Sequence, residues 1–396
     1  MDGWLADRYA RAMPISTVRS VCLMLAFLLA TPPASGEVTL TQDGSTVRVA
    51  IDGELFAALQ TAEGQAKPYL YPVMQPGWST QPFAAGHFVT VADTMLDPDA
   101  TDHIGLPLPP STQITVDRRE GDRLHLLAPL AGWIAAADAV PVLGLAVRRM
   151  DDDPLPYDRK NPAAYDHPHH RGVWIAIDEV ADTKFWSEEG RIDAVSVDVL
   201  DQSGDPARLR MTAWWYGKDD DATVVLEQVT HFAFHSDGLI DLTTVFSPPE
   251  GRDVTFGDTK EGLVGVRMPD DRREKSAGLI RNADGDVTES ATWGRPSDWV
   301  DYIGPVGGPD DADAAAPGVS LFAHPSNPRA SRYHVRGYGL FSINPFGPNA
   351  YSKGEQPAAP LTLSGDETIT LRYGVWIHGD ADRDAVAARY AKYGAE

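Results

Sequence analysis

The chain has 396 residues, with 34 Lys and Arg against 57 Asp and Glu, which gives a formal net charge of −23 at pH 7. This excess of negative charge makes nucleic acids and anionic membranes poor partners, because both would be repelled. The single cysteine, Cys22, lies in the N-terminal segment discussed next. Disulfides, cysteine metal sites and cysteine nucleophiles are therefore excluded from the rest of the chain.

The N-terminus predicts a signal peptide over residues 1–36. Three arginines precede the uncharged stretch VCLMLAFLLA, and the small-residue tail TPPASG follows it, a pattern typical of a cleaved secretory signal. The apolar stretch is too short to span a membrane. Removal of residues 1–36 would leave 31 basic against 55 acidic residues, a net charge of −24. The mature protein is then expected in the periplasm or outside the cell.

Period-two alternation of apolar and polar residues recurs along the remaining chain and predicts β-strands. The clearest segments are Thr46–Ile51, Gln113–Asp117, Ala194–Leu200, Arg208–Tyr216, Thr223–Phe234 and Thr368–His378. Turn signals occur at hairpin spacing, at Asp52-Gly53, Glu120-Gly121, Asp237-Gly238 and Asp284-Gly285. One amphipathic helix is expected at Arg383–Tyr393. The pattern predicts an all-β fold over residues 37–396, a large antiparallel β-sandwich with a short C-terminal helix.

Two stretches interrupt this pattern. Met74 to Pro110 is rich in Pro, Gly and Asp and is expected to form a flap over one end of the sandwich. Residues 307–318, GGPDDADAAAPG, form an acidic small-residue segment that cannot build a core, and a mobile excursion is expected there.

The densest polar cluster is DHPHHR, Asp166 to Arg171, directly before an apolar run. Three histidines, a carboxylate and an arginine at the start of a buried strand indicate a site of chemistry. In an extended chain His167 and His169 would project to one face and His170 to the other, so Pro168 must shape how they converge. The alternative is a hydrogen-bonded loop that fixes the start of the strand.

Three further clusters carry related chemistry. In FGDTKEGLVGVRM, an extended backbone places Glu261 and Arg267 on one face and Lys260 on the other, which suits acid–base work or an internal salt-bridge network. Strand alternation puts Glu227, His231 and His235 in one stripe, either on the solvent face or on the wall of a cleft. The segment TWGRPSDWVDY offers aromatic rings beside charged groups, as sugar recognition requires.

Eight motifs follow one another along the chain: KPYLYP, DHPHHRG, the pair Phe185-Trp186, FGDTKEG, WGRPSDWVDYIG, HPSNPR, the segment His334–Gly339 and NPFG. Taken in this order, they resemble the motifs of the PmoA-like family, secreted bacterial proteins often labelled "methane oxygenase PmoA". The resemblance covers residues 40–392. The interval between the first two motifs is longer here, which predicts an insertion at about 76–142. A membrane-helix bundle is excluded, because the chain after the signal has no run of about 20 apolar residues.

The resemblance implies a large β-sandwich similar to the galactose-mutarotase type and a context of polysaccharide breakdown. The first hypothesis is therefore a carbohydrate-active enzyme of the lyase, dehydratase, hydrolase or epimerase type. His169 or His170 is expected as the acid–base group, Glu261 as its partner, and Arg171 and Lys260 as charge-stabilising cations. Elimination is weakly favoured, because it needs a base and a cation that neutralises a uronate carboxylate. The expected substrate-binding residues are Asp166, Trp174, Arg267, Arg295, Trp299 (as a stacking platform), Tyr302, His324, Asn327 and Asn344.

Two other functions stay open, although no cofactor is expected under the first hypothesis. One is a metalloenzyme in which His167, His169, Asp166 and His324 hold a divalent ion, with an open position if it is an oxygenase. The other is a glycan-binding protein without catalysis, for which the titratable cluster would exceed what recognition needs. In either sugar-based case the expected partner is an oligosaccharide or polysaccharide.

Overall fold

The structure is a computed structural model that describes residues 36–80, 85–99, 105–110, 112–148, 167–219, 222–306 and 309–396. Residues 1–35 of the expected signal peptide and Asp166 of the polar cluster lie outside these ranges. No helix within them is both long and apolar enough to cross a lipid bilayer.

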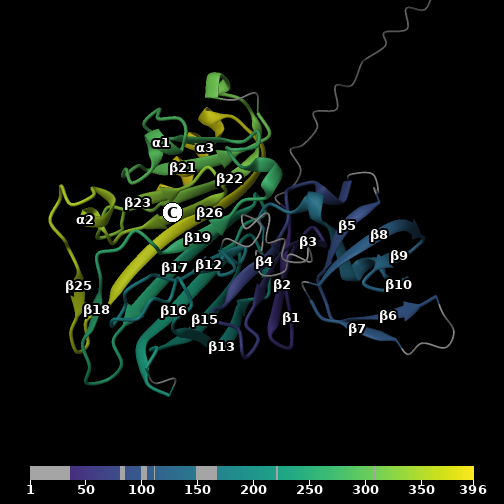
Figure 1. The fold of residues 1–396 in the computed structure, drawn as a ribbon, viewed down its shortest axis with the longest axis horizontal. Coiled ribbons are helices and arrows are strands. Elements are labelled where there is room, and N and C mark those ends of the chain that lie inside the picture. Colours follow the sequence, from purple (N-terminus) through teal and green to yellow (C-terminus); the bar gives the residue numbers. More distant parts are fainter. Residues whose placement is uncertain are drawn as a thin grey trace, which may run out of the picture. The chain divides into compact units, whose positions relative to one another are not determined.

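Two large antiparallel sheets lie within residues 35–396 (Figure 1). The nine-stranded sheet runs in the order β14 (Ser203–Gly204), β1 (Val38–Asp43), β2 (Thr46–Ile51), β3 (Glu54–Gln60), β4 (Tyr69–Val73), β12 (Val173–Ile175), β19 (Val264–Arg267), β24 (Leu340–Asn344) and β23 (Arg332–Val335). The eight-stranded sheet runs β13 (Arg191–Asp201), β15 (Ala207–Tyr216), β16 (Val224–Phe234), β17 (Leu239–Ser247), β26 (Ile369–Ala381), β22 (Ala316–Ala323), β21 (Trp299–Ile303) and β20 (Leu279–Asn282).

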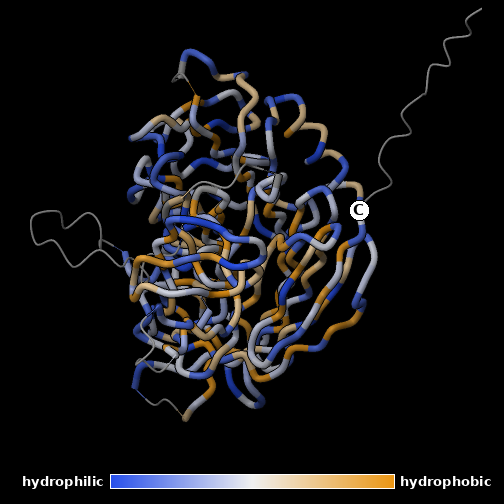
Figure 2. The backbone as a smooth tube through the Cα atoms, turned by 90° about the vertical axis from the view of Figure 1, so that its right-hand side faces the viewer, coloured by the Kyte–Doolittle hydropathy of each residue, from blue (hydrophilic) through white to orange (hydrophobic). Residues whose placement is uncertain are grey.

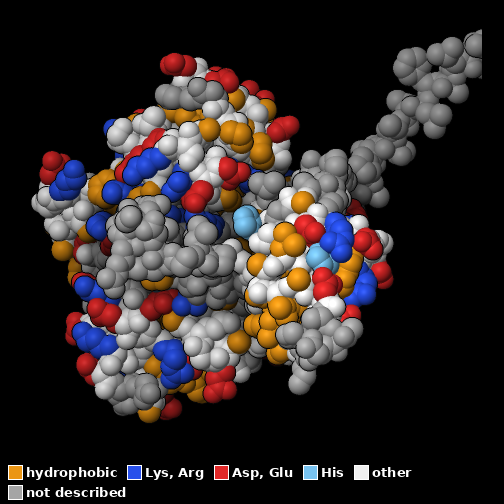
Figure 3. Space-filling model, turned by 45° about the vertical axis from the view of Figure 1, so that its right-hand side comes forward, with side chains coloured by type: hydrophobic (Ala, Val, Ile, Leu, Met, Phe, Trp, Pro, Cys, Tyr) orange, Lys and Arg blue, Asp and Glu red, His pale blue; other side chains and the backbone are white. Residues whose placement is uncertain are grey.

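A third sheet of seven strands occupies the stretch expected as an insertion. Its order is β11 (Ala139–Pro141), β5 (Gly86–Thr90), β8 (Gln113–Glu120), β9 (Arg123–Ala128), β10 (Gly132–Ala135), β6 (Thr94–Pro98) and β7 (Leu106–Leu108). The expected flap is therefore wrong, because strands within Met74–Pro110 pair with later strands and share a small core of their own. Met95, Leu106 and Leu127 of this sheet are exposed, and hydrophobic side chains gather on this part of the surface in Figure 3.

Short elements complete the described residues. They are β18 (Val254–Phe256) paired with β25 (Leu361–Leu363), the helices α1 (Glu289–Thr292), α2 (Pro348–Tyr351) and α3 (Arg383–Ala395), and single 3-10 turns at Trp78–Thr80, Ala136–Asp138, Val142–Gly144, Asp270–Arg272 and Pro309–Asp311. Helix α3 begins where the Asp382 side chain accepts a hydrogen bond from the Ala385 backbone N–H. Such a cap satisfies a donor that the first turn leaves unpaired.

The two large sheets pack together through the apolar side chains that alternate with polar ones along their strands. Along β15, Ala207, Leu209 and Met211 are buried while Arg208 and Arg210 are exposed, and the colours alternate along the strands in Figure 2. The buried set joins residues of both sheets in one core. Burial of alternate side chains fixes the strand register, because a slip of one residue would expose the whole apolar set.

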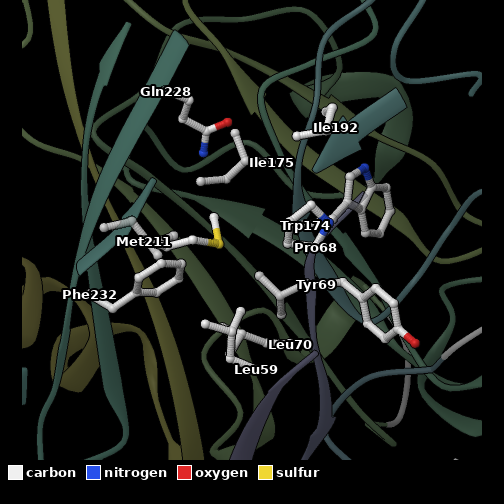
Figure 4. A pocket seen from close by; sticks show the side chains of 12 residues that line it. Leu59, Pro68, Tyr69, Leu70, Trp174, Ile175, Ile192, Met211, Gln228 and Phe232 are labelled. Atoms are coloured by element: carbon white, nitrogen blue, oxygen red, sulfur yellow. The ribbon is translucent and has the colours of Figure 1, made fainter. Parts of the chain in front are cut away.

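The core holds a small cavity of about 20 Å³ between the two sheets (Figure 4). Leu59, Leu70 and Ile175 line it from one sheet, and Met211 and Phe232 from the other. A space of this size holds about one water molecule and no sugar. Its lining shows instead that these strand faces point inward, so the opposite faces of the two sheets point away from each other.

The expectation of an all-β fold with large antiparallel sheets and a short C-terminal helix is confirmed. The prediction of a mobile segment at 307–318 is wrong for its described residues, 309–318. Strand β22 begins at Ala316, and Nη1 of the buried Arg281 donates to the carbonyl oxygens of Ala312 and Ala314 at 3.0 and 2.9 Å. The buried Arg281 thus holds the acidic segment in place, because the N–H groups of a buried guanidinium need acceptors.

Candidate active site

A row of side chains crosses the nine-stranded sheet on the face that points away from the core. Strand register places Tyr69, Trp174, Gly265, Ser342 and His334 side by side on five neighbouring strands. Gly265 is needed in this row, because a Cβ there would lie 2.4 Å from Cε2 of Trp174 and 2.7 Å from Cη2 of Trp186. The glycine leaves room for the indoles of Trp174 and Trp186 over β19.

The three histidines gather at the start of β12, beside this row. The backbone turns, with the His170 N–H donating to the His167 carbonyl oxygen at 3.0 Å. The rings of His167 and His170 stack with centroids 4.6 Å apart, and His169 meets His170 edge-on at 4.7 Å. The backbone is thus not extended here, and the turn through Pro168 brings all three rings together.

The hydrogen bonding of His170 decides its tautomer. Arginine only donates, so Nη1 of Arg267, 3.3 Å from Nδ1 of His170, makes Nδ1 the acceptor. Burial, together with His169 and Arg267, holds the pKa of His170 well below its usual value, so the ring is neutral. The single proton of a neutral ring then sits on Nε2, which has no acceptor within the described residues. His170 is consequently a donor and has no free lone pair for a base.

A group of ion pairs formed by Lys67, Glu188 and Arg171 lies beside the histidines. Nζ of Lys67, a fully buried side chain, lies 2.6 Å from Oε1 of Glu188. Arg171 binds the same carboxylate through two parallel hydrogen bonds of 3.0 and 3.1 Å. Burial would raise the pKa of Glu188, but the attraction of Lys67 and Arg171 outweighs it and lowers the pKa. Glu188 is therefore ionised and shared between two cations.

His169 lies close enough to this group for the charges of Lys67, Glu188 and Arg171 to act on it, and it stays partly open to solvent. Burial lowers its pKa to about 4, with further lowering by Lys67 and His167. No side-chain hydrogen bond of His169 occurs within the described residues. At neutral pH His169 is thus an uncharged imidazole that can accept a proton.

Tyr338 closes the cluster on its other side. Its ring stacks on His167 with centroids 5.0 Å apart, and its hydroxyl lies 3.5 Å from Nε2 of that histidine. The guanidinium of Arg267 lies 5.0 Å from the centre of the same ring. Lys67 and Arg171 share the Glu188 carboxylate, and Arg267 lies beside His170 and Tyr338. Cations gathered around the histidines of so acidic a chain favour an anionic ligand.

The Lys260–Glu261 pair lies next to the cluster, through His334. Nδ1 of the buried His334 is 3.3 Å from the Lys260 carbonyl oxygen, and Tyr351 donates to the same oxygen at 2.7 Å. The ammonium of Lys260 contacts the Glu261 carboxylate, so each neutralises the other. The backbone N–H of Asp178 donates to the Glu261 carbonyl oxygen at 2.9 Å. The Asp178 carboxylate accepts hydrogen bonds from the N–H and the hydroxyl of Ser187, and burial raises its pKa.

The burial of His334 gives the protein a testable sensitivity to acid. Burial, then Lys260 and Arg336, lower the pKa of His334 from 6.5 to about 3. Between these values the unfolded chain binds a proton that the folded chain does not, so stability falls as pH drops below 6.5. For this one group the loss is about 2 kcal/mol at pH 5. We expect His334→Gln to reduce the pH dependence of the unfolding free energy between pH 7 and pH 5 by about this amount.

Urea unfolding of the wild type and the variant at both pH values measures this difference. A matched control is His87→Gln, which changes an exposed histidine of the seven-stranded sheet. If His334→Gln unfolds with the pH dependence of the wild type, His334 does not become protonated on unfolding in this range.

Four expected substrate-binding residues have other roles. Trp299 is buried against Leu239 and Phe322 and is no stacking platform, because strand β21 is covered on both faces. Tyr302 is buried too; its hydroxyl accepts from the Glu274 N–H at 2.8 Å and donates to the Arg336 carbonyl at 3.3 Å. Asn344 donates to the Thr259 carbonyl at 2.8 Å and so positions the Lys260–Glu261 loop. Arg295 is exposed and pairs with Asp286.

His324 and Asn327 lie on the other sheet. Nε2 of His324 is 3.1 Å from Nη1 of Arg372, and Asn327 exchanges two hydrogen bonds with the Arg372 backbone. The residues that the structure brings together are instead His167, His169, His170, Arg171, Trp174 and Arg267, with Lys260 and Glu261 beside them.

No group of three or more His, Cys, Asp or Glu side chains is arranged to hold a metal ion within the described ranges. Asp166, one of the expected ligands, lies outside them, and His324 is on the other sheet. The metal alternative therefore stays a prediction without support from the described side chains.

Several members of the cluster were not singled out from the sequence. They are Lys67, Glu188, Tyr338, His334 and Ser342. Signals existed for some, since Lys67 opens the otherwise uncharged segment KPYLYP and Glu188 follows the pair Phe185-Trp186. Ser342 lies in a buried strand and gave no signal, because only the cross-strand register places it beside Trp174.

Residues 146–392 match the model of a family of unknown function, DUF6807. The chain belongs to this family. The expected membership of the PmoA-like family is thus corrected, since the family that matches is DUF6807.

Solved structures similar to the chain include galactose 1-epimerase from Lactobacillus acidophilus, with 8% sequence identity and a TM-score of 0.30. That likeness covers 88% of this chain and 99% of the epimerase. Another is a GalM/aldose epimerase homologue from C. elegans, with 8% identity, a TM-score of 0.25, and 88% and 100% of the two chains covered. Likenesses of this degree carry no argument about function. No curated protein matches the chain.

Proposed function

We propose that the histidine cluster is the active site of a carbohydrate-active enzyme that applies acid–base chemistry to an acidic oligosaccharide. The observation that carries this proposal is His169, a neutral and partly exposed imidazole close to Lys67 and Arg171. A proton acceptor close to cationic side chains suits a substrate that carries a carboxylate next to the proton to be removed.

Among acid–base reactions, elimination at a uronate uses these groups most fully. His169 removes the proton next to the carboxylate, the electron pair forms a carbon–carbon double bond, and the glycosidic oxygen leaves. The leaving oxygen takes a proton from Tyr338 or His167, which lie together on the opposite side of the cluster. Hydrolysis fits less well, because it needs two free carboxyl groups, and both Glu188 and Glu261 are ion-paired.

Three donors are available for the oxygen atoms of such a substrate. They are Nε2–H of His170, Nε1–H of Trp174 and the hydroxyl of Ser342, all buried and without an acceptor within the described residues. Buried donors without acceptors are rare, and a ligand oxygen or a water is their usual partner. In this proposal they hold the charge that builds on the carboxylate as the proton leaves. His169 is therefore the base, and His170 is a donor.

The same proposal places the enzyme outside the cytoplasm, on the strength of the N-terminal signal pattern. Polysaccharide fragments would meet it there.

Product analysis on the purified protein tests the function. Oligogalacturonate, oligoalginate, unsaturated uronate disaccharides and neutral xylo-oligosaccharides are incubated with it, and products are followed by mass spectrometry and ultraviolet absorbance. We expect a new double bond in one of the acidic substrates and no change in the neutral ones. Unchanged masses across the panel would contradict the proposal. Turnover lost on chelation and restored by one ion would support the metal alternative instead.

A further inference from the structure

A second concave site lies on the eight-stranded sheet, on the face that points away from the core. It is a groove of about 810 Å³ above β15, β16, β17 and β26, bordered by the turn at Asp205–Pro206, by Ser326 and by the end of helix α3. This volume is within the range of small-molecule sites. Because the two sheets pack by their inner faces, the groove and the histidine cluster lie on opposite faces of the sandwich.

The floor of the groove is a fixed polar network. Nε and Nη2 of Arg372 donate to the two oxygens of Asp241 at 3.1 and 2.6 Å, and Nη1 reaches Nε2 of His324 at 3.1 Å. Nδ1 of His324 lies 2.7 Å from the Ser326 hydroxyl. Asp241 and His324 are nearly fully buried. Side chains locked in this way are already ordered before a ligand binds, which lowers the entropic cost of binding.

Uncommitted polar groups stand beside this network. Strand register places His231, Thr243 and Arg372 in one row across three strands, and Thr370 follows on the same face of β26. His231, Thr243 and Thr370 make no side-chain hydrogen bond within the described residues. An imidazole and two hydroxyls that both donate and accept are suited to ligand hydroxyl groups, which also do both.

Acidic and basic side chains balance each other in the groove. The acidic side chains Asp205, Asp241 and Glu396 face the basic side chains Arg208, Arg372 and Lys392. Arg372 is neutralised by Asp241, and Arg208 by Asp201 at 2.9 Å. A chain with a net charge of −23 that presents a locally neutral, hydroxyl-rich groove favours an uncharged ligand with many hydroxyls.

An exposed indole extends this face along β15. Trp214 is 39% exposed and lies on the same face as Arg208, six residues further along the strand, or roughly 20 Å. An indole face stacks on the CH face of a sugar ring. A ligand that uses both the groove and Trp214 must therefore be an extended chain of several rings.

We propose that this groove is a binding site for an uncharged oligosaccharide, separate from the histidine cluster. It does not depend on the proposed reaction, because it shares no residue with the cluster. It would hold a neutral stretch of a polysaccharide while the cluster acts on an acidic one.

Calorimetric titration with cellohexaose, xylohexaose and hexagalacturonate tests this. We expect one of the two neutral hexasaccharides to bind the wild type, and Thr243→Arg to weaken that binding at least tenfold by filling the groove. Thr41→Arg, the same change at an exposed strand position of the other sheet, is expected to leave it unchanged. His169→Gln is also expected to leave it unchanged, since that residue belongs to the cluster.

Three results would overturn the proposal. They are no binding of either neutral hexasaccharide, binding that Thr243→Arg leaves intact, and binding that His169→Gln abolishes. If Thr243→Arg does not fold, His231→Ala combined with Thr370→Ala removes two of the uncommitted groups without adding bulk, and the same tenfold loss is expected. A failure here leaves turnover at the histidine cluster unaffected, so the two proposals can fail separately.

Discussion

Replacing His169 by glutamine is expected to lower kcat by about 100- to 10,000-fold on the acidic oligosaccharide that the wild type converts, the usual contribution of a general base. Glutamine keeps a polar side chain of similar reach but cannot take up a proton. Binding of the substrate is expected to change little, because Lys67, Arg171 and Arg267 remain. Single-turnover and binding measurements on the same preparation separate the two effects.

The pH profile of the wild type gives a second check on the same residue. In the free protein the pKa of His169 is about 4, so the acid limb of kcat/KM is expected near this value. A bound carboxylate offsets the cations that depress this pKa, so the acid limb of kcat is expected at higher pH. An acid limb of kcat at lower pH than the acid limb of kcat/KM would contradict the assignment of His169 as a base beside cations.

The matched control is His87→Gln, the same change at an exposed position of the seven-stranded sheet, which should leave kcat unchanged. Folding of His169→Gln is expected to be normal, because His169 makes no side-chain hydrogen bond within the described residues. Full turnover in this variant would show that another group takes the proton and would contradict the assignment of His169 as the base.

Several strands of the two large sheets could be predicted because one of their faces is buried and the other polar. Thr46–Ile51 was predicted with the bounds that the structure shows, and Arg208–Tyr216 and Thr223–Phe234 differ by one residue at their start. The seven-stranded sheet was missed in part, because five of its seven strands have only three to five residues. Alternation is a weak signal in strands of three to five residues.

The histidine cluster could be located from its density, but its chemistry could not be assigned. Which of His169 and His170 can act as a base depends on Arg267, 97 residues further along the chain. Trp299 and Tyr302 were read as ligand contacts because they stand among charged residues. In the structure all five residues of β21 are buried, so the aromatic rings belong to the interior. Sequence neighbours do not reveal burial when a strand is covered on both faces.

Asp301→Ala is expected to destabilise the protein by about 3–5 kcal/mol, the usual loss when one partner of a buried ion pair is removed. The Asp301 side chain is fully buried. Its Oδ2 accepts from Nε and Nη2 of Arg281 at 3.0 and 2.8 Å, and its Oδ1 accepts from Ser320 at 2.8 Å. Burial raises the pKa of Asp301, but His378 and Arg281 outweigh it and lower the pKa, so the carboxylate is ionised.

Removing this carboxylate leaves Arg281 buried with an uncompensated charge, and leaves Ser320 and Nε2 of His378, 2.9 Å from Oδ1, without their partner. The four residues come from β20, β21, β22 and β26, so one carboxylate joins four strands of the eight-stranded sheet. Urea unfolding at pH 7 measures the loss. Asp366→Ala, in an exposed turn, is the control and should cost less than about 0.5 kcal/mol.

The conservative variant Asp301→Asn separates charge from hydrogen bonding. Asparagine can still accept from Arg281 through its amide oxygen, but it leaves the guanidinium charge without a counter-charge. Its loss of stability is therefore expected to lie between those of Asp301→Ala and Asp366→Ala. Equal losses for all three variants would contradict a buried ionised network. Because Tyr302 follows Asp301 in β21 and its hydroxyl bonds the Arg336 and Glu274 backbone, this network also supports the loop that carries Tyr338 to His167.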